Sequence, residues 1–209
     1  FRRDIFVRGL RRIPRDEAVD ALWLGLANPK TGERVLSTQL GEARLPEAIT
    51  DAAIQALSQA PQTVAALRAL ETCRNVTPSE LAALLVGAGC AVPLWSLPAE
   101  GVDHTVALAR SRSFNAVAAR RLAHAGRALG QFGLASPFLG GALPASSLDL
   151  ATAPVLAGQP LGSLDAEAVA QQILPPGEVL APDVLEALHD ALRGLLQNRW
   201  PLWRSLGIV

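Results

Sequence analysis

The pattern of apolar and polar positions near the start of the chain is that of short strands and turns. Residues 4–8 (DIFVR) and 35–40 (VLSTQL) are short runs rich in apolar or β-branched residues, which favour strands. Residues 28–32 (NPKTG) carry the Asn, Pro and Gly typical of a turn, and residues 15–22 favour a short helix. We therefore predict a small sheet in this region, with one short helix beside it.

A helical period begins at Pro46. Apolar residues recur at intervals of three and four positions, as one stripe before Pro61 and a second stripe after it. The stripes consist of Ile49, Ala53, Ala56 and Leu57, and of Val64, Leu67 and Leu70. Each stripe predicts one helix with a single buried face.

Residues 78–88 give the clearest local signal of a helix. Thr77 and Glu80 match a capping box, and Pro78 suits the first helical position. A strand candidate, residues 90–95 (CAVPLW), follows at once. Three helices and then a strand are the order expected of a winged-helix-like module.

After residues 97–103 (LPAEGVD), which have the composition of a linker, the pattern restarts. Helices are expected over residues 114–125, 147–157 and 165–173 and from Pro182 onward, with a short hairpin over residues 132–146. Leucines at intervals of three and four give the last helix an amphipathic stripe: Leu185, Leu188, Leu192 and Leu195.

These elements predict a helix-rich α+β fold of two small lobes. The first lobe, residues 1–100, would contain the small sheet and the winged-helix-like three-helix module. The second lobe, residues 101–209, would be helical with a short hairpin. A chain of 209 residues is long enough for either one or two hydrophobic cores.

The composition is that of a globular protein, with 50% hydrophobic residues, 18% charged residues and no formal net charge. The longest uncharged run, residues 81–99, contains several glycines and prolines, so a buried helix and strand explain it better than a membrane span. Cys73 and Cys90 lack the spacing of a zinc site or a disulfide framework, which predicts buried thiols and a cytoplasmic location. The start at Phe1 and the lack of methionine predict a piece of a longer protein, unless modified methionines are missing from the sequence.

Charge is distributed unevenly along the first quarter of the chain. Residues 1–15 hold six arginines and one aspartate, whereas residues 16–51 hold seven acidic and three basic residues. The arginines would form exposed ion pairs within the chain, or would contact another domain or a substrate. A nucleic-acid partner is disfavoured, because no Lys or Arg lies between Arg74 and Arg110, where the recognition helix of a winged-helix protein would be.

Motifs that carry chemistry are missing from the sequence. It contains no GxGxxG, no P-loop, no GxSxG and no HExxH. The histidines at positions 104, 124 and 189 are far apart and lack neighbouring acidic partners in a recognisable motif. The glycine pair at positions 140 and 141 predicts a turn rather than an anion-binding loop. We therefore predict no catalytic, cofactor-binding or metal-binding residue.

Several ordered motifs nevertheless resemble a known family. They are FRRDIFVRG at residues 1–9, RLPEAITDAAIQALSQAPQTVAALRAL at 44–70, SFNAVAARRL at 113–122 followed by LASPFLGGALPAS at 134–146, LPPGEVLAP at 174–182 and WPLWRSLGIV at 200–209. With these motifs the chain resembles the predicted methyltransferase regulatory region of bacterial class I S-adenosylmethionine-dependent methyltransferases, some of which are similar to rickettsial-type protein lysine methyltransferases. The resemblance implies a catalytic domain upstream of Phe1, which would bind the S-adenosylmethionine.

The expected function is therefore that of a non-catalytic regulatory or substrate-recognition region. Its expected partners are the upstream catalytic domain, a protein substrate and, in a homodimer, a second copy. The candidate contact residues are Arg2, Arg3, Arg8, Arg120 and Arg121.

Two alternatives stay open. In a dimerisation or protein-interaction module, the last helix, with Trp200 and Trp203 near its end, would pack across a two-fold axis. In a winged-helix transcription regulator, binding to DNA would depend on salt, which the cation-free segment around residues 78–99 disfavours.

Overall fold

The computed structural model describes residues 13–30, 32, 35–38, 41–95, 97, 103–125, 132–139 and 141–209. Over these residues the chain is a helix-rich α+β protein, as predicted, and its short strands form small antiparallel sheets. The predicted strand over residues 4–8 lies outside the described residues, and so do Arg2, Arg3 and Arg8.

In the first half of the chain, the first described element is α1 (Arg15–Asp20). Three further helices lie around one sheet. The helices are α2 (Glu47–Gln59), α3 (Val64–Arg68) and α4 (Pro78–Gly87), and the strands, in spatial order, are β4 (Gln62–Thr63), β1 (Trp23–Leu26) and β5 (Ala91–Pro93). A short 3₁₀ helix (Glu71–Cys73) lies between α3 and α4. The order of three helices followed by a strand, β5, is the order that the sequence predicts.

The start of α4 follows the predicted capping box. The amide N–H of Glu80 donates to Oγ1 of Thr77 over 3.3 Å, and the amide N–H of Thr77 donates to the Glu80 carboxylate over 3.1 Å. These two bonds satisfy backbone donors that the first helical turn leaves without partners.

The sequence pattern does not predict β1, the central strand of the sheet. β1 precedes the three helices in the chain and pairs antiparallel with both neighbours, so that Leu24 lies opposite Gln62 and Pro93. β1 has only four residues, one of them glycine, so it is too short to show the alternation of apolar and polar positions that is typical of a strand. A Cβ atom on Gly25 would lie 3.2 Å from the Leu94 side chain, so glycine allows the close packing here. Of the strand predicted over residues 35–40, β2 (Val35–Thr38) is described; it forms a separate hairpin with β3 (Gly41–Arg44).

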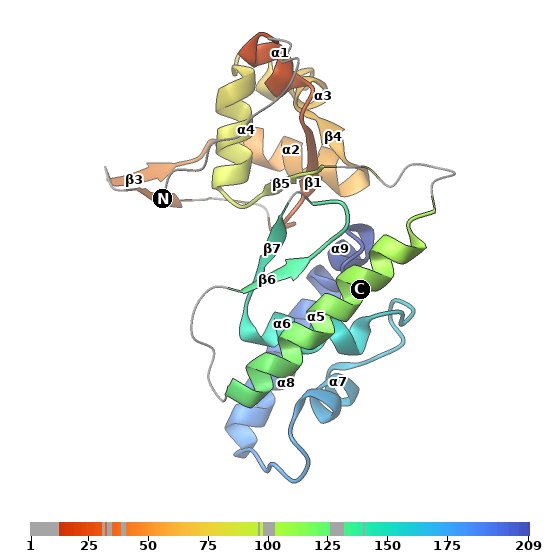
Figure 1. Cartoon of the computed structure of the whole chain (residues 1–209). Coiled ribbons are helices and arrows are strands. Elements are labelled where there is room, and N and C mark those ends of the chain that lie inside the picture. Colours follow the sequence, from red (N-terminus) through yellow and green to blue (C-terminus); the bar gives the residue numbers. More distant parts are fainter. Residues whose placement is uncertain are drawn as a thin grey trace.

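The second half consists of helices around one hairpin. Its elements are α5 (Thr105–Ala125), β6 (Phe132–Ala135), β7 (Ala142–Ala145), α6 (Ser147–Leu156), α7 (Ala166–Ile173), α8 (Pro182–Asn198) and α9 (Trp200–Ser205). Figure 1 shows these elements, coloured green to blue, gathered at the end of the molecule opposite the red-to-yellow helices of the first half. The hairpin of β6 and β7 lies where the sequence predicts it.

Two helix boundaries in this half differ from the prediction. α5 begins at Thr105, nine positions before the predicted start, and the Thr105 N–H donates to Oδ1 of Asp103 over 2.8 Å. Residues 105–113 carry no clear apolar stripe, so this extension has little sequence signal. The last helix stops at Asn198 and a separate α9 begins at Trp200, because Pro201 has no N–H to continue the helical bonds.

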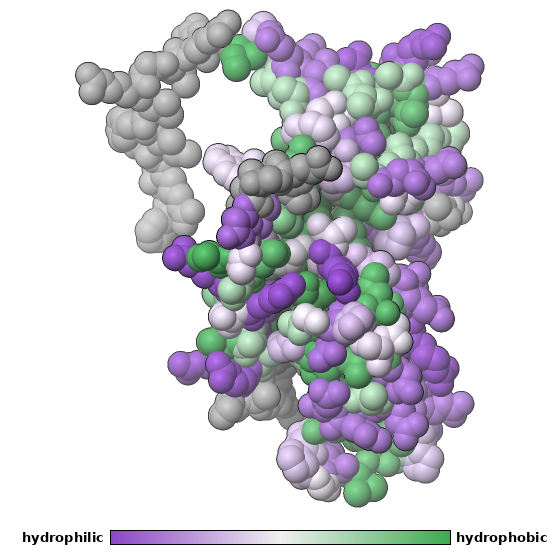
Figure 2. Space-filling model, turned by 90° about the vertical axis from the view of Figure 1, so that its right-hand side faces the viewer, coloured by the Kyte–Doolittle hydropathy of each residue, from purple (hydrophilic) through white to green (hydrophobic). Residues whose placement is uncertain are grey.

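Two groups of buried side chains form the cores. The first lies within residues 24–91 and consists of aliphatic residues, alanines and the two cysteines. The second lies within residues 94–209 and includes the aromatic side chains of Phe138, Trp200 and Trp203. On the face shown in Figure 2, hydrophobic residues are scattered among hydrophilic ones, as expected when the cores hold most large apolar side chains.

The two halves are in direct contact. Leu26 and Val92, from strands of the first half, also pack against the second core. Leu94 forms a β-bridge with Leu139, and the Trp95 N–H donates to the carbonyl of Phe138 over 2.8 Å. The lobe boundary predicted between residues 100 and 101 lies outside the described residues.

Candidate functional site: a cleft between the two halves

Of the five arginines singled out by the sequence, the structure describes Arg120 and Arg121. Arg120 and Arg121 lie on the exposed side of α5, and neither lines the cleft described below. The ring of His104 packs edge-on against Phe138, with 5.3 Å between the ring centroids, and its Nε2 atom is buried without a hydrogen-bond partner. This geometry indicates a packing role for His104. His189 is partly buried in α8, and the side chain of His124 lies outside the described residues.

Two adjoining hollows open between the halves of the molecule, and we call them together the interlobe cleft. Both are lined by Pro29 of the first half and Asn198 of the second. The polar end has a volume of about 450 Å³. The apolar end has a volume of about 570 Å³. Volumes of this size are typical of ligand sites.

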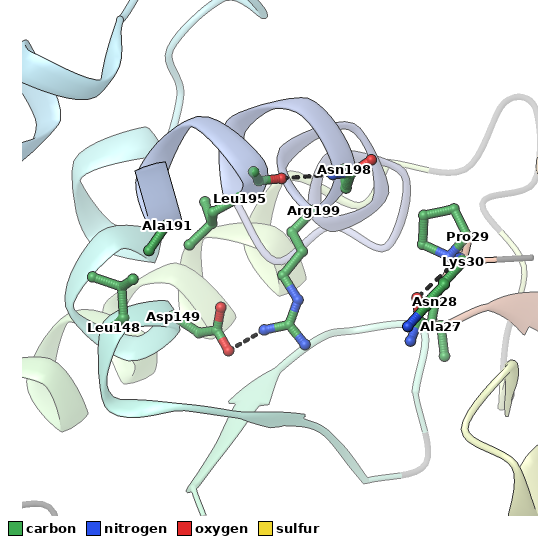
Figure 3. A pocket seen from close by; sticks show the side chains of 11 residues that line it. Ala27, Asn28, Pro29, Lys30, Leu148, Asp149, Ala191, Leu195, Asn198 and Arg199 are labelled. Carbon is green, nitrogen blue, oxygen red and sulfur yellow. Dashed lines mark hydrogen bonds and ion pairs between the residues drawn. The ribbon is translucent and has the colours of Figure 1, made fainter. Parts of the chain in front are cut away.

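An ion pair between Asp149 and Arg199 dominates the polar end. Figure 3 shows the two side chains pointing toward each other, Asp149 from the start of α6 and Arg199 from the junction of α8 and α9. The Asp149 side chain is 3% exposed, whereas that of Arg199 is 41% exposed. The guanidinium group therefore pairs with the carboxylate and remains accessible to a ligand.

Local structure fixes the position of Asp149. The Ser146 N–H donates to Oδ2 of Asp149 over 2.7 Å, and the Asp149 N–H donates to Oγ of Ser146 over 3.1 Å, which is a second capping box. Hydrogen bonds at the start of its own helix therefore hold the carboxylate in addition to its ion pair with Arg199. This arrangement satisfies a buried charge that would otherwise be costly.

Across the polar end lies the loop that follows β1, with Asn28, Pro29 and Lys30 (Figure 3). The side chains that line this end include two cations, Lys30 and Arg199, and one carboxylate, that of Asp149. Because the Arg199 guanidinium is partly exposed, the polar end suits a ligand group that accepts hydrogen bonds.

Among the residues that the structure describes, none with a charged side chain lines the apolar end. Its floor consists of large apolar side chains from both halves, namely Leu26, Leu57, Leu94, Phe138, Leu202 and Leu206. Ser58, Gln59 and Ala60, where α2 ends, also line it. Because the last carbonyl groups of a helix have no partner within the helix, they can accept hydrogen bonds from the backbone of a bound chain.

Within the part of the chain that the structure describes, no three His, Cys, Asp or Glu residues are placed to hold a metal ion. The pKa of Glu80 is lowered by hydrogen bonds from Thr77, and that of Asp103 is lowered by hydrogen bonds from Thr105. Both carboxylates cap helices and lie outside the cleft, so their lowered pKa values reflect capping.

Sequence reasoning did not identify the cleft. A partial signal exists for Asp149, because Ser146 and Asp149 have the spacing of a capping box. Nothing near Arg199 in the sequence marks it as the partner of a residue fifty positions earlier. The apolar end depends on contacts between the halves and has no local signal.

Comparisons with known proteins leave the family of the chain open. No protein-family model matches it, and neither the curated proteins nor the solved structures include a significant match. Among the described helices, none combines the length and the apolar character needed to cross a membrane.

Proposed function

We propose that this chain is the non-catalytic substrate-recognition region of an S-adenosylmethionine-dependent methyltransferase, and that the interlobe cleft takes a segment of a protein substrate. The methyltransferase assignment rests on the motif resemblance described above. The observation that supports recognition is the cleft itself, which has a polar end with Arg199 and Lys30 beside an apolar end without charges. The proposal places the catalytic domain and its cofactor elsewhere in the parent protein, in the cytoplasm.

The shape of the cleft suggests how a segment would bind. An apolar side chain of the substrate would fill the end lined by Phe138 and Leu202, and an acidic side chain or carbonyl group would face Arg199. Both ends are lined by two parts of the chain that are packed together, so the bound segment would be held in one orientation. Orienting a substrate near a methyl donor contributes to rate through proximity.

The dimerisation alternative has less structural support than recognition. Leu192 and Leu195 of the α8 stripe are 0% and 5% exposed, and Trp200 and Trp203 are 2% and 0% exposed. These side chains fill the core of their own half and do not form an open face. A homodimer through another surface stays a prediction.

The DNA-binding alternative also lacks a suitable surface on its expected recognition helix. The most exposed residues of α4 are Glu80, Ala83, Val86 and Gly87. None is basic, so the helix offers no cation to phosphate groups.

Recognition is tested by selecting binders from a library of random peptides and measuring their affinity by calorimetry. We expect the selected peptides to combine large apolar residues with an acidic one. Replacing exposed Ala60, at the rim of the apolar end, by Trp should fill the cleft and weaken binding by at least about tenfold, or 1.4 kcal/mol. The matched control is Ala187→Trp, on an exposed position of α8 outside the cleft. Peptides that bind both variants equally would place recognition elsewhere.

The methyltransferase assignment is tested separately. Calorimetric titration of the chain with S-adenosylmethionine should give no binding, whereas the chain extended upstream of Phe1 should bind it. In the extended protein, Ala60→Trp should lower kcat/KM for a protein substrate and leave the affinity for S-adenosylmethionine unchanged. Tight binding of the cofactor by these 209 residues alone would replace the proposal with one built around an internal cofactor site.

A further inference from the structure

A third hollow, smaller than the other two, lies in the second half and shares no lining residue with the cleft. Its volume is about 240 Å³. Five residues from α5, from the loop after α6 and from α9 onward line it: Arg112, Gly158, Gln159, Arg204 and Val209. Two of these five side chains are guanidinium groups and none is acidic, so the lining side chains are positively charged.

The hydrogen bonds of the two arginines leave most of their donors unused. Nη2 of Arg112 donates to the Val209 carbonyl over 2.9 Å, and Nη1 of Arg204 donates to the Gln159 carbonyl over 3.1 Å. Nε of Arg112 is buried and has no hydrogen-bond partner. Among the described residues, neither arginine forms an ion pair with an Asp or Glu side chain. A guanidinium has five N–H donors, and a buried donor without a partner is costly.

We propose that this hollow binds a small oxyanion, such as inorganic phosphate, a phosphate monoester or a carboxylate. Arginine pairs with two oxygens of an oxyanion at once, and two arginines from different helices can hold it from two sides. Gly158 adopts a φ of +78°, and a Cβ there would meet no atom within 4 Å, so the loop leaves the hollow open. The proposal is independent of the proposed function, because the cleft and the hollow share no residue.

The competing explanation is purely structural. Arg204 lies in the last turn of α9, where a cation interacts favourably with the helix dipole, and Arg112 holds the segment that ends at Val209. In that case the arginines would stabilise the fold and would bind no added anion. The experiment must therefore detect binding as well as stability.

The test is a titration of the chain with inorganic phosphate at constant ionic strength, with chloride as the balancing anion. NMR signals of the arginine Nε–H groups report on the site, and the Tm reports on linkage between binding and folding. We expect a saturable shift of the Arg112 Nε–H signal, with a Kd on the order of 1 mM. Parallel titrations with phenyl phosphate and acetate distinguish a phosphate ligand from a carboxylate ligand.

Two variants and one control connect the shift to the site. Arg112→Lys keeps the charge but removes the planar fork, and Arg204→Gln removes a charge at an exposed position that the fold tolerates. Each should weaken phosphate binding by about tenfold. Arg110→Gln, on an exposed position of the same helix outside the hollow, should leave binding unchanged.

A last control distinguishes binding of an added anion from the effect of the terminal carboxylate that the expressed chain carries after Val209. The titration is repeated on a chain with Gly-Ser added after Val209, which moves that carboxylate away from Arg112. Saturable binding by either form, lost in the two variants, supports the proposal. In Arg112→Lys the Arg204 Nε–H signal and the Tm serve as the readout, and in Arg204→Gln the Arg112 Nε–H signal does. The proposal is overturned if neither form shows a shift beyond that caused by chloride, or if phosphate binding persists in both variants.

Discussion

The two halves of the molecule differ in how their buried polar groups are satisfied. In the first half, buried Thr50 donates to carbonyl groups of Pro46 and Glu47, within one turn of its own helix. In the second half, Thr152 donates to the Leu148 carbonyl in the same local way. However, Asn115 there exchanges two hydrogen bonds with Ala135, twenty positions away, and the Ser136 hydroxyl donates to the carbonyl of Leu206.

This difference shows which contacts define the folded structure of each half. Among the described residues of the first half, the buried polar side chain is Thr50, which is satisfied within its own helix, whereas the distant pair of Arg68 with Asp20 is partly exposed. We therefore expect the first half to tolerate the loss of one polar side chain. The second half is closed by polar contacts between residues far apart in the sequence, and a buried network that loses one member leaves the others without partners. We therefore expect the second half to be the more sensitive to polar substitutions.

The largest expected effect is that of Trp203→Ala. Trp203 is fully buried in the second core, and its removal should lower the free energy of unfolding by about 4 kcal/mol. Leu81→Ala, in the first core, should cost about 3 kcal/mol. Urea unfolding measures both, with Trp95→Ala, at a side chain that is 85% exposed, as the control. Hydrogen exchange then tests whether the two halves unfold separately. An equal loss of amide protection in both halves after Trp203→Ala would mean that they unfold as one cooperative unit.

Asn115→Ala should cost about 2 to 3 kcal/mol, because it leaves the N–H and the carbonyl of partly buried Ala135 without their side-chain partner. The corresponding change in the first half, Thr50→Val, should cost less than about 1 kcal/mol, because the carbonyls it leaves are in helical positions. Chemical unfolding of the two variants provides the measurement. Equal costs would remove the distinction between locally and distantly satisfied polar groups.

Arg199→Gln should cost about 2 kcal/mol, less than for a fully buried pair, because solvent reaches the arginine and partly replaces it. The expected loss comes from the Asp149 carboxylate, which stays buried with only its capping bonds. Arg193→Gln is the matched control, since its pair with Asp190 is exposed on both sides and should contribute at most about 1 kcal/mol. If both variants lost the same free energy of unfolding, the buried Asp149 carboxylate would not need Arg199 for its stabilisation.

The smallest expected effect concerns Glu80 and pH. Hydrogen bonds from Thr77 lower the pKa of Glu80 below its ordinary value of 4.5, so the ionised form stabilises the folded state at neutral pH. This contribution is present above pH 4.5 and is lost as the pH falls through the folded-state pKa. Glu80→Gln should therefore be less stable than the parent chain at pH 7, with the difference shrinking in acid. Asp103→Asn in the second half should behave in the same way, because capping is local in both halves.

Much of the fold could be predicted from the sequence because its signals are local. The capping box of Thr77 and Glu80, the helical stripes after Pro46 and the hairpin over residues 132–146 all depend on residues only a few positions apart. Such interactions form within one turn or one hairpin, and no distant part of the chain is needed to define them.

The candidate site, in contrast, depends on contacts between residues that are far apart in the sequence. Its polar end joins Asp149 to Arg199, fifty positions apart within the second half, and its apolar end joins Leu57 of the first half to Leu202 of the second. The central position of β1 is decided in the same way, by its pairing with strands more than thirty positions away. The sequence by itself determined which segments form helices, where several of them begin, and the absence of known catalytic motifs. The tertiary structure alone decided which distant residues meet, because those contacts require two cores to form and pack against each other.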